Sequence, residues 1–222
     1  SRIGFGAFQG SGDSYFDEIR IGTTLADVMT LPPGATWVNT GSGNWSTPAN
    51  WDAPVPNGPD QFAALADSIL APSTVTVDVP VTINRVEFQS TNSYTLAGAS
   101  TLTMGGTTPE LRLLEGTHTL TVPLATSSGG ASPLLISGVG TLMIPGTQNF
   151  TDGVLIRGAT VSVDTLANGG VPSGIGAASA FAFPSIALGA GGTLRYTGTG
   201  HSTDRILSLD GGVGTLDASG SG

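Results

Sequence analysis

The stretch LGAGGTLRYTGTGHSTDRILSLDGGVGTLDASGSG, from Leu188 to Gly222, contains two copies of one phrase, GGTLRYTG and GVGTLDAS. Each copy is a Gly-rich turn followed by a short run that alternates apolar and polar residues, as a half-buried strand does. Looser versions precede it: GASTLTMGG, EGTHTLTVP, GVGTLMIPG and GATVSVD. The spacings between the equivalent residues are 18, 22, 19, 33 and 22 for Leu102, Leu120, Leu142, Val161, Leu194 and Leu216. A strand that recurs at this period predicts a solenoid, in which each repeat buries its apolar face on the next.

The composition agrees with an all-β solenoid. The chain has 222 residues, of which 39% are hydrophobic and only 10% are charged, and it contains 34 glycines. Short apolar strands, Gly-rich corners and the absence of helical periodicity predict parallel β-coils. From residue 75 to the end, the repeat period predicts about seven coils. Solenoid architecture of this kind favours a scaffold or adhesin over a catalyst.

Charge and cysteine content exclude several classes of function. The net charge is −9, and all seven basic residues are Arg. An acidic chain with scattered Arg lacks the basic surface that binds nucleic acid or anionic membranes. The chain has no Cys, so it forms no disulfides, and no apolar stretch is long enough to span a membrane. Because it opens on Ser1 without a signal peptide, we expect a piece of a longer protein.

The sequence predicts four regions. Residues 1–30 form N-terminal β-strands and 31–35 a proline-containing linker. Residues 36–72 form a Trp-rich cap. Residues 73–222 form the parallel β-helix, in which Val75, Val77, Val79 and Val81 are predicted to share one face. A long insertion at 164–189 interrupts the repeat, and such insertions often lie on the binding face of a solenoid. Within it, ASAFAF could form a short helical turn or an apolar flap.

Residues 1–30 contain two strand-like runs, RIGFGAF and YFDEIRIG. In the second run Ile19 and Ile21 share one face and Phe16 lies on the other. One hairpin is too small to bury a core, so these residues must pack on the rest of the chain, on a preceding domain or on a neighbouring molecule. In the last case they are assembly strands that complete the neighbour.

The stretch YFDEIRIGTTLADVM resembles the final strand of laminin-G-like (concanavalin-like) domains. The resemblance implies that residues 1–30 are the remnant of a jelly-roll domain or an exchanged strand. It also makes Asp13, Asp17 and Glu18 candidate Ca²⁺ ligands.

The three tryptophans of the chain, Trp37, Trp45 and Trp51, lie within 15 residues of one another. One interpretation is an N-terminal cap, in which aromatic side chains cover the first coil so that apolar strands do not face water. The other is a glycan-contact platform, because clustered indoles can stack on sugars.

The segment from Ala167 to Gly222 resembles the autotransporter-associated β-strand repeat family, especially in the phrase GGTLRYTG…STDR. QNFTDGVLIRGATVSVD, from Gln148, resembles another phrase of that family, and the tryptophan segment resembles the entry segment of such proteins. The resemblance implies a right-handed parallel β-helix exported to the bacterial surface or beyond.

His201, Ser202 and Asp204 have the residue types of a catalytic triad. A triad requires the base to lie between nucleophile and acid in space, and three side chains crowded into one turn rarely achieve this. We therefore predict turn chemistry, with Asp204 and Arg205 pairing locally or capping the corner.

The remaining candidates for catalysis or metal binding are isolated. His118 stands alone in EGTHTLTV and is expected to face solvent or to stack on a neighbouring coil. No second His or acid cluster has metal-ligand spacing. The acids near the repeats occupy non-equivalent positions: Asp164, Asp204, Asp210 and Asp217. We therefore expect no enzyme activity and no cofactor, apart from the Ca²⁺ option above.

These observations predict a non-enzymatic structural protein, extracellular or at the bacterial cell surface, that assembles end to end into filaments. The alternative is an adhesin stalk or carbohydrate-binding β-helix that contacts surface glycans through the tryptophan segment or the insertion. A polysaccharide lyase or hydrolase is the least expected function, because it needs carboxylates that recur on adjacent coils.

Overall fold

The computed structural model describes residues 34–127, 132–182 and 184–219. All of them belong to one compact unit, Pro32–Gly222. Several predictions concern residues outside these ranges: Asp13, Phe16, Asp17, Glu18, Ile19 and Ile21.

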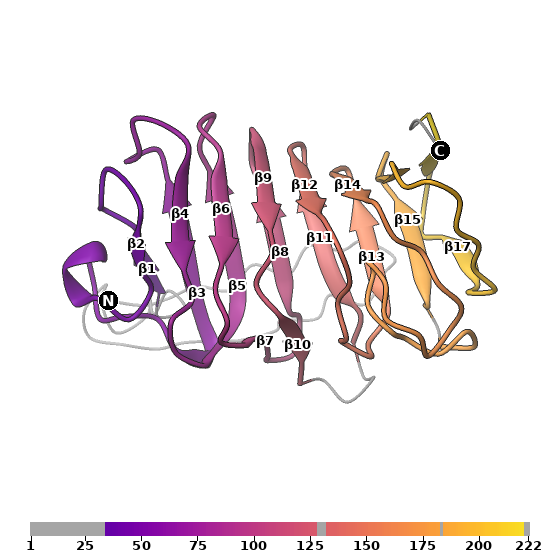
Figure 1. Ribbon diagram of the computed structural model, residues 1–222, viewed down its shortest axis with the longest axis horizontal. Helices are drawn as coiled ribbons and strands as arrows, with labels where there is room; N and C mark the ends of the chain where they lie inside the picture. Colours follow the sequence, from indigo (N-terminus) through magenta and orange to yellow (C-terminus); the bar gives the residue numbers. More distant parts are fainter. Residues whose placement is uncertain (1–33, 128–131, 183, 220–222) are drawn as a thin grey trace, which may run out of the picture. The chain divides into compact units, whose positions relative to one another are not determined.

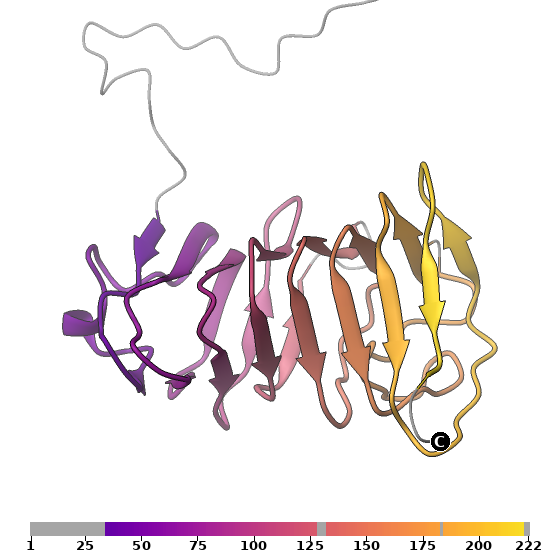
Figure 2. The same ribbon diagram turned by 90° about the horizontal axis from the view of Figure 1, so that it is seen from above.

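The described residues form two parallel β-sheets that run side by side along a solenoid (Figure 1, Figure 2). The first sheet contains β1 (Gly34–Thr36), β3 (Gly58–Ala66), β5 (Val81–Gln89), β7 (Leu102–Met104), β8 (Glu110–Leu113), β10 (Leu124–Thr126), β11 (Leu134–Gly138), β13 (Val154–Arg157), β15 (Ile186–Gly189) and β17 (Leu207–Leu209). The second sheet contains β2 (Gly43–Asn44), β4 (Ser73–Thr76), β6 (Tyr94–Ala97), β9 (Thr117–Leu120), β12 (Thr141–Ile144), β14 (Thr160–Val163), β16 (Thr193–Tyr196) and β18 (Thr215–Asp217).

The chain alternates between the two sheets, so that one strand or strand pair from each sheet makes a rung. The second sheet has eight strands, one for each rung, and the solenoid therefore makes about seven turns. The described helical structure is one short 3₁₀ turn, η1 (Pro48–Asn50). No helix of the described residues is both long and apolar enough to cross a membrane. The predicted all-β parallel solenoid is confirmed.

The register of the second sheet tests the proposed repeat positions. Leu142, Val161, Leu194 and Leu216 lie side by side on consecutive rungs, as predicted. The other two equivalences are wrong: Leu102 lies on the first sheet, and the neighbour of Leu142 is His118 instead of Leu120. Each coil contributes alternating strands to both sheets, so a sequence period alone does not tell which sheet a strand joins.

The predicted run of four valines is divided by a corner. β4 ends at Thr76, and β5 begins at Val81 on the other sheet. Val75 and Val81 are buried, whereas Val79 is 38% exposed. Pro80 lies between the strands and cannot donate a ladder hydrogen bond, which explains why the run is not one strand.

The core lies between the sheets and consists of apolar columns. One column of the first sheet passes from rung to rung through Ala63, Val86, Leu111, Ile136, Ile156 and Leu188, which are all buried. Parallel stacking of this kind gives every inner side chain a neighbour above and below. Burial therefore depends on adjacent rungs more than on the strand itself.

Close approach between rungs requires glycine at particular corners. Gly138, at the end of β11, has a φ of +112°, and a Cβ there would lie 1.9 Å from the Leu113 carbonyl oxygen. A larger residue would meet both backbone strain and a clash, which explains the glycine at this corner.

Candidate functional site

The tryptophan segment closes the first rung of the solenoid. Trp37 and Trp45 are fully buried, and Trp51 is 5% exposed. The Trp51 ring lies edge-on to both others, with centroid distances of 5.2 Å to Trp37 and 4.9 Å to Trp45. Its Nε1 donates to the Trp45 carbonyl at 2.7 Å, and the Trp45 Nε1 donates to the Pro56 carbonyl at 2.9 Å.

Polar side chains complete this closure. Asn50, in η1, donates from Nδ2 to the Asn44 carbonyl at 2.8 Å and accepts from Asn39 at 2.9 Å. Figure 1 shows η1 at the end of the row of strands, beyond β1 and β2. None of the three indoles offers a face to solvent, which stacking on a sugar requires. Their burial favours the cap interpretation over the platform.

The insertion leaves β14 at Asp164 and returns to the ladder at β15, which takes up the last four residues of the predicted range. Part of it packs on the solenoid: Ile175 and Ala178 are buried. The Ala177 amide donates to the Phe150 carbonyl at 2.7 Å, and Gln148 forms an isolated bridge with Ser173. The insertion is therefore attached along its base.

Arg205 is the main polar anchor of the insertion. It is 5% exposed, and its guanidinium donates to the Ile175 carbonyl at 3.0 Å and to the Ser185 carbonyl and hydroxyl, each at 2.9 Å. Burial lowers the pKa of Arg205 to about 10, so it remains charged at neutral pH. The predicted local pairing with Asp204 is replaced by this clamp, because the Asp204 carboxylate accepts from the Gly169 amide at 2.8 Å.

The outer part of the insertion presents apolar side chains to solvent. Phe181 is 86% exposed and Val171 is 50% exposed. Phe181 lies in the run ASAFAF, and the described residues of this run, 178–182, contain a turn and no helix. Aromatic residues, Phe among them, are enriched at the surfaces through which proteins bind one another. We therefore treat the insertion as the candidate functional site.

The three triad-like residues do not form a triad. His201 Nδ1 lies 2.6 Å from the Tyr196 hydroxyl, while Asp204 binds the Gly169 amide. Both contacts hold the turn after β16, as turn chemistry predicts.

The acids near the repeats have structural partners. Asp164 accepts from the Gly146 amide at 2.8 Å. Asp210 pairs with Arg157, and Asp217 accepts from Arg195 at 2.7 Å. Hydrogen bonds from Ser219 and then Arg195 lower the pKa of Asp217 to about 2. Within the described ranges no group of three or more His, Asp or Glu could hold a metal ion.

His118 is fully buried and stacks on Phe88 of the neighbouring coil, with ring centroids 4.7 Å apart. This settles the sequence alternatives in favour of stacking. Burial lowers its pKa below 6.5, so the ring is neutral at pH 7. Its Nδ1 accepts from the Tyr94 amide at 3.1 Å, which leaves Nε2 as the donor to the Glu115 carbonyl at 2.9 Å.

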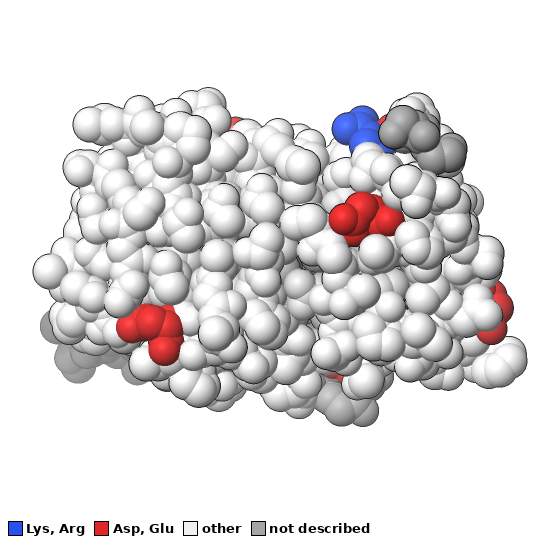
Figure 3. All heavy atoms as spheres, in the orientation of Figure 1, with Lys and Arg blue, Asp and Glu red and all other residues white. Residues whose placement is uncertain are grey.

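The face of the molecule in Figure 3 carries few charged groups. On the second sheet, threonines form an in-register ladder on the side opposite the buried leucines: Thr117, Thr141, Thr160, Thr193 and Thr215. Such hydroxyl ladders suit parallel strands, and they give the outer side of the second sheet a row of neutral, hydrogen-bonding groups.

The geometry is that of a parallel β-helix with a closed first rung and an anchored side loop. The chain is similar to "Adhesin BmaC autotransporter" of Brucella suis biovar 1 (strain 1330), with 34% identity over 190 residues. The match covers 82% of this chain but only 5% of the relative, so the chain spans a small part of that protein's length. No protein-family model matches the chain, and no solved structure matches it significantly.

Fold and relative together define the class of protein: a bacterial cell-surface or extracellular β-helix. Within that class, the chain fits the autotransporter passenger-like family of β-strand repeats. The resemblance drawn from the GGTLRYTG…STDR phrase is thereby confirmed.

The roles of two residues, Arg205 and Gln148, were not predicted from the sequence. The position of Arg205 as the last residue of the STDR phrase is a weak sequence signal for its role in holding the insertion. The sequence carries no signal for Gln148, because its side chain contacts β10, which lies 24 residues away in the sequence.

Proposed function

We propose that this chain is a length of adhesin stalk whose side insertion, 164–185, makes contact with a target surface. The single observation that carries the proposal is Phe181, which is 86% exposed on a loop clamped at its base by Arg205. The similarity to an adhesin supports it. The proposed function is mechanical and adhesive and requires neither catalysis nor a cofactor.

The solenoid suits a stalk for a physical reason. Rungs of a parallel β-helix are spaced by about 4.8 Å, and each is held by ladder hydrogen bonds to the next. Such a rod extends in one direction while insertions project sideways from chosen rungs. A contact residue on an insertion can thus vary without disturbing the core.

The test compares two exposed apolar residues. Beads coated with the whole chain, its Phe181→Ser variant or its Leu70→Ser variant would be bound to a cultured epithelial monolayer and to a glycan array. Leu70 is 82% exposed on a different turn, so it is a matched control. We expect Phe181→Ser to reduce adherence at least fivefold and Leu70→Ser to leave it unchanged. Equal adherence of all three proteins would refute the contact role of the insertion, and the array would show whether surface glycans are the ligand.

End-to-end assembly is a second proposed function, favoured by the last described rung. Among the described residues no rung follows β17 and β18, and two side chains of the inward columns are exposed, Leu209 at 65% and Leu216 at 60%. A further rung, supplied by the same or another molecule, would bury these residues and pair with β17 and β18. The proposed assembly strands with Phe16, Ile19 and Ile21 are one source of such a rung.

Electron microscopy of the purified protein tests assembly directly. We expect filaments from the unmodified chain, and single rods from a Leu209→Lys, Leu216→Lys double variant and from a chain lacking residues 1–30. Leu70→Lys serves as the control and should still assemble. Single rods from the unmodified chain over a wide range of protein concentrations would reject the filament proposal.

A further inference from the structure

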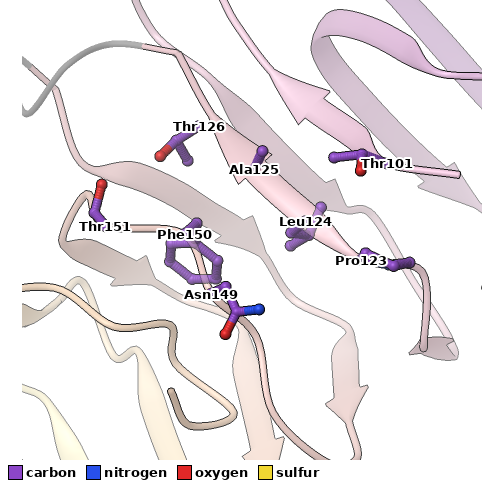
Figure 4. Close-up of a pocket in the computed structure, with 8 residues that line it drawn as sticks. All are labelled: Thr101, Pro123, Leu124, Ala125, Thr126, Asn149, Phe150 and Thr151. Atoms are coloured by element: carbon purple, nitrogen blue, oxygen red, sulfur yellow. The ribbon is translucent and has the colours of Figure 1, made fainter. Parts of the chain in front are cut away.

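A groove of ≈ 370 Å³ lies beside β10, between this strand and residues 149–151 (Figure 4). Leu124 and Phe150 form its apolar floor and are buried, while Asn149 and Thr151 are exposed at its rim. Figure 4 shows the two walls as separate segments, β10 on one side and the loop after β12 on the other. The volume falls within the range of ordinary ligand sites.

One edge of β10 is available in this groove. Among the described residues β10 pairs with β7 alone. The Leu102 amide donates to the Pro123 carbonyl at 2.9 Å, and the Ser127 amide donates to the Met104 carbonyl at 3.0 Å. Because residues of a parallel strand alternate in the direction of their backbone groups, Leu124 and Thr126 direct theirs away from β7.

The side chain of Gln148 shows which chemistry this edge accepts. Its Oε1 accepts from the Leu124 amide at 2.9 Å, and its Nε2 donates to the Val122 carbonyl at 3.3 Å. Gln148 is 3% exposed. One side-chain amide therefore makes the two hydrogen bonds that a neighbouring strand would make with the first part of the edge. The next backbone groups along the edge, around Thr126, lie in the groove.

A second observation also indicates an unfilled partner. Thr126 Oγ1 is buried and has no hydrogen-bond partner among the described residues. Buried polar atoms of native proteins are rarely left unpaired. This hydroxyl belongs to a residue that lines the groove and continues the edge beyond Gln148.

We propose that this groove binds an extended, uncharged peptide segment of another protein, which adds as a further strand to the part of the β10 edge around Thr126 that Gln148 leaves open. None of the eight residues that line the groove is charged, so a charged side chain of the peptide would find no partner of opposite charge there. Strand addition uses backbone hydrogen bonds for affinity and pockets for alternate side chains. The groove does not include Phe181, and its ligand is independent of the proposed adhesive contact of the insertion.

The experiment selects ligands without assuming their sequence. A displayed library of random twelve-residue peptides is selected on the whole chain, and the strongest binder is synthesised for measurement of its Kd. Two variants disturb the groove differently. Thr126→Pro removes the edge amide at a position where an edge strand tolerates proline, and Asn149→Trp fills the groove from its rim. Circular dichroism verifies that both variants fold.

Ser208→Trp is the matched control. It places the same bulky side chain in another groove, of ≈ 180 Å³, that Leu155 and Ala187 also line. We expect at least tenfold weaker peptide binding with Thr126→Pro and with Asn149→Trp, and unchanged binding with Ser208→Trp. N-methylation of alternate peptide amides should weaken binding to a similar degree, because it removes the ladder donors.

Three outcomes would overturn the proposal. The library could yield no binder, or the binders could be insensitive to both groove variants. Alternatively, a glycan array could detect a ligand that is lost with Asn149→Trp but kept with Thr126→Pro. That last pattern would identify the groove as a sugar site that does not use the strand edge.

Discussion

The first and last described rungs contain similar apolar residues in very different surroundings. At the first rung Trp37 is fully buried and Trp51 is 5% exposed. At the last rung Leu209 is 65% exposed, although its neighbour in the same column, Leu188, is 1% exposed. The second sheet repeats this contrast, with Leu194 at 4% and its neighbour Leu216 at 60%.

The difference shows what supplies burial in a solenoid. Leu188 and Leu209 lie in one column of the first sheet. They differ in that another described rung follows Leu188 and none follows Leu209. The tryptophan segment replaces that missing rung at the first coil with large aromatic side chains and a short 3₁₀ turn. The apolar columns of a solenoid are therefore kept from water at an end only where further residues cover that end.

The largest expected effect is at the closed end. Trp51→Ala removes the ring that contacts both other indoles, and large-to-small changes of this kind cost about 3–5 kcal/mol. Urea unfolding followed by circular dichroism measures the loss. Val38→Ala, at a residue that is 45% exposed in the same segment, should change stability by less than about 0.5 kcal/mol. A Trp51→Ala loss below about 1 kcal/mol would mean that the aromatic cluster does not close the solenoid.

The second largest effect is expected at Arg205, which holds the insertion against the solenoid. Arg205→Ala leaves two carbonyls and a hydroxyl in the insertion without their donor, at a cost of about 2–4 kcal/mol. Hydrogen exchange should accelerate at the Ala177 amide of the insertion, which donates to the Phe150 carbonyl of the solenoid and is protected by that hydrogen bond. Arg195→Ala removes an exposed ion pair and should leave both stability and exchange nearly unchanged. Similar exchange in the two variants would contradict the clamp.

The free energy of unfolding should depend on pH through His118, which is buried in the interior. The folded-state pKa of His118 is depressed by burial, so the unfolded state binds the proton more readily as pH falls below 6.5. Stability should be constant above that pH and fall below it by up to about 1.4 kcal/mol per pH unit. His118→Asn should remove this slope between pH 6.5 and the folded-state pKa, while the exposed His201→Ala should retain it. A slope that persists in His118→Asn would assign the effect to another group.

The smallest effect is expected at the open rung. Leu216→Ala alters a residue that is 60% exposed and should change monomer stability by less than about 0.5 kcal/mol. Leu194→Ala changes the same residue type in the same column one rung earlier, where it should cost about 2–5 kcal/mol. Equal losses would show that Leu216 is covered in solution, as assembly through this rung requires.

Much of the fold could be predicted because the relevant signals are local. Gly-rich corners and alternating strands recur along the chain, and the columns from Leu142 to Leu216 follow directly from that period. The tryptophans stood out by their clustering in the sequence, and the long gap in the repeat located the insertion. Local spacing failed where a coil changes sheet, as with Leu102 and the valines on either side of Pro80.

The candidate site was less predictable because its contacts join distant residues. Arg205 reaches the Ile175 carbonyl across 30 residues, and Gln148 reaches the edge of β10 across 24. His118 looked like a strand residue that could face either side, and only the stacking of coils placed it on Phe88. Repeat period and turn chemistry are properties of neighbouring residues, and net charge is a sum over the chain, so the sequence by itself determined them. Which sheet a strand joins, which apolar residues are covered and which strand edge stays open depend on the rung above and the rung below, so only the tertiary structure decided them.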